Sequence, residues 1–164
     1  ILTTAKSIAA GLPLSAIVAR SEILDAVPTG TIGGTFCGNP LACAAALETI
    51  ALMEEQRLDV RAEEIGQIVR ARCAKLQETY PVLGEVRGLG AMLGLEFVED
   101  PATKAPNGAL VTKLVQECAQ RGLLVENAGR WGQVLRFLAP LVITDEQLQA
   151  GLDILEEALA ACVA

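Results

Sequence analysis

The sequence predicts a mixed fold in two parts, an α/β segment over residues 1–57 and an α+β domain over residues 58–164. Short strand-like and helix-like stretches alternate after residue 80, which is the pattern of a sheet layered with helices. Two long helical patterns meet at a break over residues 56–59, and we place the domain boundary in that break. A length of 164 residues suits one domain and approaches the length of two small ones.

The first predicted elements are a strand end, a loop, a short strand and a short helix. The loop carries Lys6, and the apolar run at residues 16–19 is typical of a strand. A helix is predicted over residues 21–27, because Ser21 is a good N-cap residue and Pro28 cannot continue a helix. Strand and helix therefore alternate in this part of the chain.

A glycine-rich loop and a long helix complete the first part. Residues 28–38 hold four glycines and three threonines, which predicts a flexible loop. Asn39 suits the N-cap position and Pro40 the first helical position, so a helix is expected from Pro40 to about Glu55. The first half of this helix is almost all Ala, Leu and Cys, and we expect it to be buried nearly all round.

The second part begins with a helix, a strand and a loop. The helix is predicted from the break to about residue 79, with its apolar side chains on one stripe. A strand is predicted over residues 86–98, in which buried and exposed side chains alternate, and residues 99–108 form a polar loop with two prolines. The helix stripe consists of Ile65, Ile68, Val69 and Leu76, and the alternating strand residues are Leu93, Leu95 and Phe97 against Met92, Gly94 and Glu96.

The last third of the chain predicts a helix, two strands and a final helix. The first helix covers about residues 109–121, with Gly122 as its C-terminal cap. Short strands over residues 123–125 and 134–138 flank a turn at residues 127–132. The final helix begins with a capping box, Thr144 with Gln147, and carries Leu148, Leu152, Leu155 and Leu159 on one face.

Composition argues against several classes of function. The formal net charge is −7, so a nucleic-acid partner, which needs a basic stripe, is not expected. Hydrophobic residues make up 52%, but no apolar run approaches the ~20 residues that cross a bilayer, so no membrane partner is expected either. The apolar excess points instead to large buried or subunit-facing surfaces.

The cysteines predict no metal site. There are five of them, none with CxxC spacing, and the chain has no histidine. Most lie on apolar helix faces, where they behave as small buried hydrophobes in a reducing cytoplasm. The first residues show no basic stretch followed by an apolar core, so no signal peptide is expected and the predicted location is cytoplasmic.

Lys6 is the candidate catalytic residue. It lies in a run of small and apolar residues, with no charged residue within ten positions on either side. A lysine amine with few water contacts is easier to deprotonate, because burial disfavours the charged form. A neutral amine can attack a carbonyl and form a Schiff base. The alternative is a side chain that extends from a partly buried loop to water without a catalytic role.

Thr35 and Arg136 are the candidate binding residues. Thr35 follows two glycines, which let backbone N–H groups approach a phosphate closely, and its hydroxyl adds a donor. The alternative for Thr35 is a plain flexible loop. Arg136 interrupts a predicted strand, and its planar fork suits a bidentate contact with a carboxylate. The alternative for Arg136 is a charge on an edge strand that faces water.

Five sequence motifs are informative when they are considered together and in their order along the chain. They are Thr3-Thr4-Ala5-Lys6-Ser7-Ile8, Gly33-Gly34-Thr35-Phe36-Cys37-Gly38-Asn39-Pro40, Arg87-Gly88-Leu89-Gly90, Val134-Leu135-Arg136-Phe137-Leu138-Ala139-Pro140-Leu141 and Ile143-Thr144-Asp145-Glu146-Gln147-Leu148. Together, in this order, they resemble the class III (omega-amino-acid) aminotransferases, which are fold-type I enzymes that use pyridoxal 5'-phosphate (PLP). The resemblance covers the whole chain.

The resemblance assigns a role to each candidate residue. Residues 1–57 would be the end of the large cofactor-binding domain, and residues 58–164 the C-terminal small domain. Lys6 would hold PLP as a Schiff base and move a proton during the reaction. Thr35 would contact the PLP phosphate of the partner subunit, which implies a homodimer, and Arg136 would bind the α-carboxylate of glutamate or 2-oxoglutarate.

The implied reaction moves an amino group from 4-aminobutyrate, or a similar omega-amino acid, to 2-oxoglutarate by a ping-pong mechanism. Other class III enzymes, the acetylornithine or ornithine aminotransferases and the glutamate-1-semialdehyde aminomutases, remain alternatives, as does a non-catalytic α+β interaction domain. By resemblance, the residues that pair with the pyridine nitrogen, stack on the ring and hold most of the phosphate lie upstream. The chain alone is therefore expected to be inactive and to bind PLP weakly or not at all.

Overall fold

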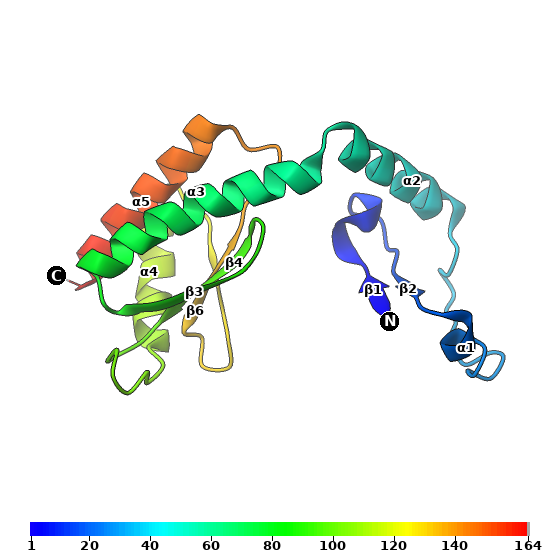
Figure 1. Cartoon of the computed structure of the whole chain (residues 1–164), viewed down its shortest axis with the longest axis horizontal. Coiled ribbons are helices and arrows are strands. Elements are labelled where there is room, and N and C mark those ends of the chain that lie inside the picture. Colours follow the sequence, from blue (N-terminus) through cyan, green and yellow to red (C-terminus); the bar gives the residue numbers. More distant parts are fainter. Residues whose placement is uncertain (164) are drawn as a thin grey trace. The chain divides into compact units, whose positions relative to one another are not determined.

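The computed structural model describes residues 1–163, and the chain divides into two compact units, Ile1–Arg57 and Leu58–Ala164 (Figure 1). The first unit holds a pair of short strands and three helical segments. The second unit holds a four-stranded sheet and three long helices, which together enclose a hydrophobic core.

The first unit opens with an antiparallel pair of strands, β1 (Leu2–Thr4) and β2 (Ala16–Val18). Between them the chain forms a short 3-10 helix, η1 (Lys6–Ala9), where the sequence predicted a loop. Two α-helices follow, α1 (Ser21–Leu24) and α2 (Pro40–Glu55). The predicted strand before α1 is confirmed, and α2 has the predicted bounds.

The N-terminal cap was predicted correctly for α2 and wrongly for α1. Asn39 Oδ1 accepts hydrogen bonds from the backbone N–H groups of Leu41 at 2.9 Å and Ala42 at 3.4 Å, as an N-cap side chain does. In α1, Ser21 is the first helical residue, and Arg20 takes the N-cap position without a side-chain hydrogen bond. This helix is also shorter than predicted, so a favourable cap residue alone did not set its start or its length.

The expected all-round burial of α2 is wrong. The buried residues of this helix are the small ones, Ala42 and Ala46, and the helix packs against η1. Leu41 and Leu47 are 73% and 69% exposed. An apolar composition makes burial favourable, but the burial itself depends on how many elements pack around the helix, and composition does not show that.

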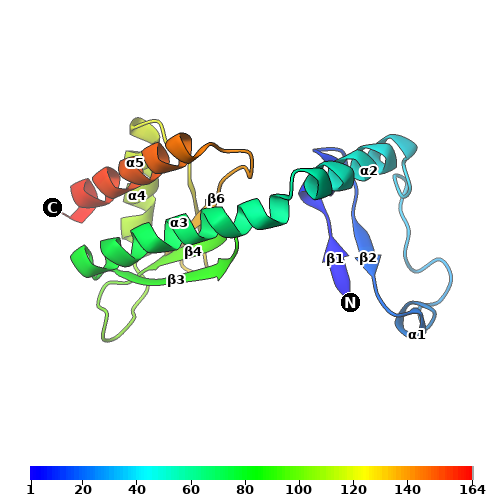
Figure 2. The same cartoon turned by 45° about the horizontal axis from the view of Figure 1, so that its top comes forward.

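The second unit is built on an antiparallel sheet with strand order β3-β4-β6-β5 (Figure 2). The strands are β3 (Leu83–Leu89), β4 (Met92–Phe97), β5 (Glu126–Ala128) and β6 (Val134–Leu138). Because β6 pairs with both β4 and β5, it lies inside the sheet, whereas β5 lies at an edge.

The single strand predicted over residues 86–98 is wrong, because the chain turns back within it. β3 and β4 form a hairpin in which Leu89 pairs with Met92. Gly88 and Gly90 have backbone φ angles of 141° and 52°, in the region that glycine adopts easily and other residues rarely do. The alternation of side chains continues on both sides of the turn, so periodicity alone did not reveal it.

The strand predicted over residues 123–125 is also misplaced. Pairing with β6 begins at Glu126, and β5 ends at Ala128, so the strand covers the start of the predicted turn. Leu123 and Val125 pack against the core, which explains their apolar character without a strand. The strand predicted over residues 134–138 is confirmed as β6.

Three helices cover one face of the sheet: α3 (Leu58–Thr79), α4 (Gly108–Gln120) and α5 (Asp145–Val163). Their apolar faces and the inward residues of the strands form one core, as the periodicity predicted. The most deeply buried side chains of this core include Ile65, Val69, Leu93, Leu95, Phe97, Val111, Leu114, Leu135, Leu148, Leu152 and Leu159. None of the described helices is long and apolar enough to cross a membrane.

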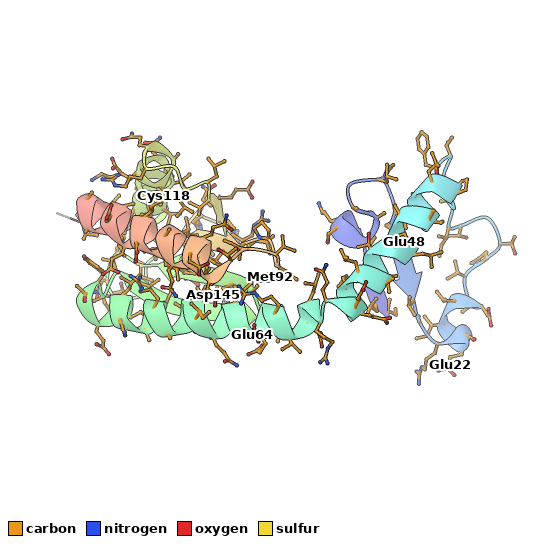
Figure 3. The ribbon with its side chains drawn as sticks, turned by 90° about the horizontal axis from the view of Figure 1, so that it is seen from above. Glu22, Glu48, Glu64, Met92, Cys118 and Asp145 are labelled. Atoms are coloured by element: carbon orange, nitrogen blue, oxygen red, sulfur yellow. The ribbon has the colours of Figure 1, made fainter. Side chains whose placement is uncertain are left out.

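Ion pairs join α3 to the last helix. The Arg61 guanidinium contacts Asp145 at 2.7 Å and Glu64 at 3.4 Å; both acids are labelled in Figure 3. Arg72 pairs in the same way with Asp153 and, at 2.6 Å, with Glu156. The two arginines therefore hold α3 against α5 at two positions along the helix.

The cysteines are only partly the buried hydrophobes that the sequence predicted. Cys73 and Cys118 are buried in the core, and burial raises the pKa of each thiol to about 11. Cys43 and Cys162 are half-buried, and Cys37 is exposed because it lies in the glycine-rich loop rather than on a helix face. The five thiols are free.

Replacing Thr144 with alanine is expected to destabilise the second unit by about 1 kcal/mol. The predicted capping box is confirmed, since Gln147 N–H donates to Thr144 Oγ1 and Thr144 N–H donates to Gln147 Oε1, both at 3.2 Å. Denaturant unfolding measures the change, and Thr112→Ala serves as control because the Thr112 hydroxyl donates to a helix carbonyl and caps no free N–H. Equal losses in the two variants would contradict the capping role.

Candidate functional site

Lys6 lies at the first position of η1, and Ala5 alone separates it from the end of β1. Its backbone φ is 63°, a left-handed conformation that is uncommon for residues other than glycine and costs on the order of 1 kcal/mol or more. Such conformations cluster at active sites. The Lys6 side chain is exposed, so the expectation that burial keeps this amine away from water is not met in this chain.

Small residues hold the Lys6 turn in place. Ala9, at the end of η1, is completely buried, and η1 packs against α2, in which Ala42 and Ala46 are the buried residues. Alanine side chains allow this close approach, so the short turn is anchored on a long helix. The structure thereby presents the Lys6 amine to solvent from a fixed and conformationally costly turn.

Thr35 lines a shallow groove of about 420 Å³ together with the segment that follows η1. The loop that carries Thr35 is shaped by two tight turns, in which Cys37 N–H donates to the Gly34 carbonyl at 3.0 Å and Asn39 N–H to the Phe36 carbonyl at 3.2 Å. The groove is lined by Pro13, Leu14, Ser15, Gly34, Thr35, Phe36, Cys37 and Gly38.

The two candidates of the first unit fit two different chemical groups. The Lys6 amine suits an aldehyde, with which it can form a covalent bond. The Thr35 hydroxyl is exposed, and a Cβ at Gly33 would meet no atom within 4 Å, so a phosphate has room to approach this backbone. Lys6 does not line the groove at Thr35, and the two residues are brought into the same unit but not into one pocket.

Arg136 lies on the open face of the second unit's sheet. Leu135 on one side is buried and Phe137 on the other is half-buried, whereas the Arg136 side chain is 44% exposed, as strand alternation predicts. The alternative, a charge on an edge strand that faces water, is wrong about the strand, because β6 pairs with strands on both sides, and correct about the exposure of the side chain. The guanidinium is therefore held on an inner strand, and the side chain faces solvent.

A carboxylate of this chain already contacts Arg136. Glu126 on β5 stands directly opposite it in the strand register, and the two side chains form a hydrogen-bonded ion pair. The sequence-based reasoning missed Glu126, because the strand was placed three residues too early and this residue fell between strand and turn. The useful signal was the turn at Gly129–Gly132, which places residues 126 and 136 opposite each other.

A second arginine lies on the same sheet face, with Gly94 between it and Arg136. Arg87 on β3 pairs with Gly94, which in turn pairs with Arg136 on its other side. The Arg87 guanidinium contacts Glu85 at 2.9 Å and also hydrogen-bonds Glu96, which holds the pKa of the Glu96 carboxyl below its ordinary value. Arg87 is thus occupied by two acids, which favours a structural role for it.

The described residues hold no metal cluster, and the tryptophan of the chain lies beside an arginine. No group of three or more acidic or thiol side chains in residues 1–163 is arranged to hold a metal ion. Trp131 is exposed, and the Arg130 guanidinium lies 5.3 Å from its ring centroid.

Comparisons with known proteins cover nearly the whole chain. The family model described as aminotransferase class-III matches residues 1–159. A probable 4-aminobutyrate aminotransferase of Bacillus subtilis is 45% identical over 161 residues, which are 98% of this chain and 37% of that protein. The 5-aminovalerate aminotransferase DavT of Pseudomonas putida is 42% identical over 158 residues, which are 96% of this chain and 37% of that protein.

Solved structures show the same fold. An amine transaminase from an uncultivated Pseudomonas species, in its PLP-bound form, matches with a TM-score of 0.86 and 32% identity. The match covers 98% of this chain and 38% of that one. The chain thus spans well under half the length of the relatives it matches, in sequence and in structure alike.

Proposed function

The chain belongs to the class-III aminotransferases, and we propose that it serves as the C-terminal portion of a PLP-dependent enzyme that transfers amino groups. The proposed amino donor is 4-aminobutyrate or a similar omega-amino acid, and the proposed acceptor is 2-oxoglutarate. The names of the two curated relatives, one for 4-aminobutyrate and one for 5-aminovalerate, support an omega-amino acid as donor. The observation that carries the proposal is the exposed Lys6 on its left-handed turn.

Lys6 is the proposed catalytic residue. Its Nζ atom would hold the aldehyde carbon of the cofactor, be released by the amino substrate, and then carry the proton that leaves the substrate carbon. An amine on a flexible stem can do both, whereas a guanidinium stays protonated. PLP, when bound, supplies the electron sink that makes this carbon acidic. The anchored turn limits where the amine can reach, which favours one geometry for the transfer.

Thr35 is the proposed phosphate contact. Its exposed hydroxyl and the open backbone at Gly33 offer donors to a phosphate oxygen. We propose that this phosphate belongs to the active site of a second subunit, so that two copies of the enzyme complete each other's sites in a homodimer. The exposed leucines of α2, Leu41 and Leu47, support a role for this unit in subunit contact. We also propose that the enzyme is cytoplasmic.

Arg136 is the proposed receptor for the substrate carboxylate. The planar fork of arginine binds both oxygens of a carboxylate, and β6 holds it on the open sheet face. The donor 4-aminobutyrate has no α-carboxylate, whereas glutamate and 2-oxoglutarate have one. Arg136 therefore supports a ping-pong reaction in which the two substrates use one site in turn.

Borohydride reduction of the PLP-treated enzyme is expected to leave the pyridoxyl group on Lys6. The measurement is peptide mapping of the longer protein that carries this chain together with the remaining length of its relatives. Lys104 provides a matched control, because it is exposed and also has a left-handed backbone, with φ of 54°. A label on Lys104, or on Lys75 or Lys113, in place of Lys6 would refute the proposed function.

A further inference from the structure

A pocket of about 550 Å³ lies at the β3 edge of the second unit's sheet. Its walls come from the end of α3, from β3 and β4, and from the loop over residues 99–107 that joins β4 to α4 (Figure 1). Lys6, Thr35 and Arg136 are not among the residues that line it. The pocket is therefore separate from each of the candidate site residues.

The loop holds Lys104 in the pocket wall. Two backbone hydrogen bonds close this loop, from Lys104 N–H to the Asp100 carbonyl and from Glu99 N–H to the Ala105 carbonyl, both at 2.8 Å. Lys104 has the left-handed φ of 54°, and such conformations cluster where a ligand is bound. None of the ion pairs within residues 1–163 involves the Lys104 amine, so its three donors are available to a ligand.

A carboxylate with a spare oxygen lines the same pocket. Glu85 Oε2 accepts a hydrogen bond from the Arg87 guanidinium at 2.9 Å, which leaves Oε1 for a ligand. Glu96 also lines the pocket, but both of its oxygens are occupied, Oε2 by Arg87 and Oε1 by Gln133 at 3.3 Å. Glu85 is thus the acid that can accept from a ligand, and Lys104 is the base that can donate to one.

The remaining wall offers apolar contacts and free space. Pro81 and Pro101 line the pocket and are exposed, and Val98 is buried behind them. A Cβ at Gly84 would lie 3.0 Å from Val98 Cγ1, so the glycine keeps open a space that another side chain would fill. Methylene groups suit such a wall, in which a few polar groups fix the orientation of a ligand.

We propose that this pocket is a second ligand site, which binds a zwitterion whose ammonium and carboxylate are separated by an aliphatic stem. The ammonium donates to Glu85, and the carboxylate accepts from Lys104. Glu85 and Lys104 form no ion pair with each other among the described residues, so a ligand that contacts both must carry its charges apart. Omega-amino acids meet this requirement, and α-amino acids, whose charges are adjacent, do not.

The probe for this site is 6-aminohexanoate. It is added at constant ionic strength to the ¹⁵N-labelled 164-residue chain, and the backbone amide signals of Gly84 and Lys104 are followed to saturation. Exposed ion pairs are weak, so the concentration for half-saturation is expected to rise by a factor of about two to five in Lys104→Gln and in Glu85→Gln. Dispersed spectra check that each variant is folded.

Three related compounds test the need for two separated charges. Hexanoate lacks the ammonium, hexylamine lacks the carboxylate, and 2-aminohexanoate carries both charges at one end. Each loses one of the two contacts, so each is expected to need about two to five times the concentration of 6-aminohexanoate for half-saturation. Equally tight binding of any of them would overturn the proposed ligand class.

Lys75→Gln is the matched control, because it removes the same charge from an exposed position on α3 outside the pocket. It is expected to bind 6-aminohexanoate as the wild type does. A loss equal to that of Lys104→Gln would reveal a general charge effect and overturn the proposal, as would the absence of saturable shifts at Gly84 and Lys104. Labelling at Lys6 tests the proposed function separately, so either result can fail while the other holds.

Discussion

Replacing Gly66 with alanine is expected to lower the free energy of unfolding of the second unit by about 1–3 kcal/mol. In an ordinary helix interior the same change stabilises by roughly 0.8–1.0 kcal/mol, because alanine is the better helix former. Gly66 is buried in α3 where the helix meets the hairpin turn between β3 and β4. A Cβ at this position would overlap the carbonyl oxygen of Gly90 and lie 2.7 Å from its carbonyl carbon.

The atoms that obstruct a methyl group at Gly66 belong to the backbone, and for that reason we expect Gly66→Ala to lower the free energy of unfolding. Gly90 has a left-handed φ of 52° in a tight turn, so its carbonyl has little freedom to move aside. The alanine variant must therefore shift α3 away from the sheet, which loosens the packing of the core around Ile65 and Val69. The cost of this shift outweighs the gain in helix propensity.

Gly151→Ala is the matched control, since it makes the same change in a helix with room for the methyl group. A Cβ at Gly151 in α5 would lie 3.5 Å from the nearest atom, Leu123 Cδ1, which is an ordinary contact. This variant is expected to be stabilised by up to about 1 kcal/mol. Denaturant unfolding followed by Trp131 fluorescence, which reports on the second unit, compares the two. A Gly66→Ala protein as stable as Gly151→Ala would contradict the close approach of α3 and the turn.

Local patterns predicted most elements of the second unit correctly. The stripe of α3, the alternation in β4 and the leucine face of α5 each bury one side of an element, and that periodicity is written in neighbouring residues. The capping residues Asn39 and Thr144 act within three residues of their partners, so their function is equally local. Such features need no knowledge of the rest of the fold.

The features that sequence reasoning missed depend on contacts between distant residues. The turn at Gly88 and Gly90 is required because α3 approaches it from more than twenty positions away in the chain. The exposure of Leu41 and Leu47 depends on which elements pack against α2, and their own identity does not determine it. In both cases the local pattern was compatible with two structures, and the tertiary contacts chose between them.

In the candidate site, too, the sequence predicted what depends on a single residue and missed what depends on the folded structure. The side-chain chemistry of Lys6, Thr35 and Arg136 pointed to an amine, a phosphate contact and a carboxylate receptor. The left-handed backbone of Lys6 was not predictable, because a lysine carries no preference for that conformation. Glu126 was missed as the partner of Arg136, because the strand was placed three residues too early and the pairing depends on a register that a shift of one residue would abolish.

Replacing Arg136 with alanine is expected to weaken the use of 2-oxoglutarate and glutamate by roughly 30- to 1000-fold, or about 2–4 kcal/mol. This magnitude applies to a carboxylate bound out of water in the complete enzyme. In this chain the Arg136 side chain is 44% exposed, and an ion pair at such a position contributes far less. The measurement is kcat/KM for each substrate of the enzyme that carries this chain.

The loss in Arg136→Ala should differ between substrates, because 4-aminobutyrate has no α-carboxylate for the fork to bind. Arg87→Ala is the matched control, since it removes a guanidinium from the same sheet face, two strands away across Gly94. Arg87 is held by Glu85 and Glu96, so its loss is expected to affect stability and to change all substrates alike. Equal losses for 4-aminobutyrate and 2-oxoglutarate in Arg136→Ala would show that Arg136, too, acts in the structure of the sheet. A selective loss, with partial recovery in Arg136→Lys, would identify it as the carboxylate receptor, because lysine keeps the charge and lacks the fork.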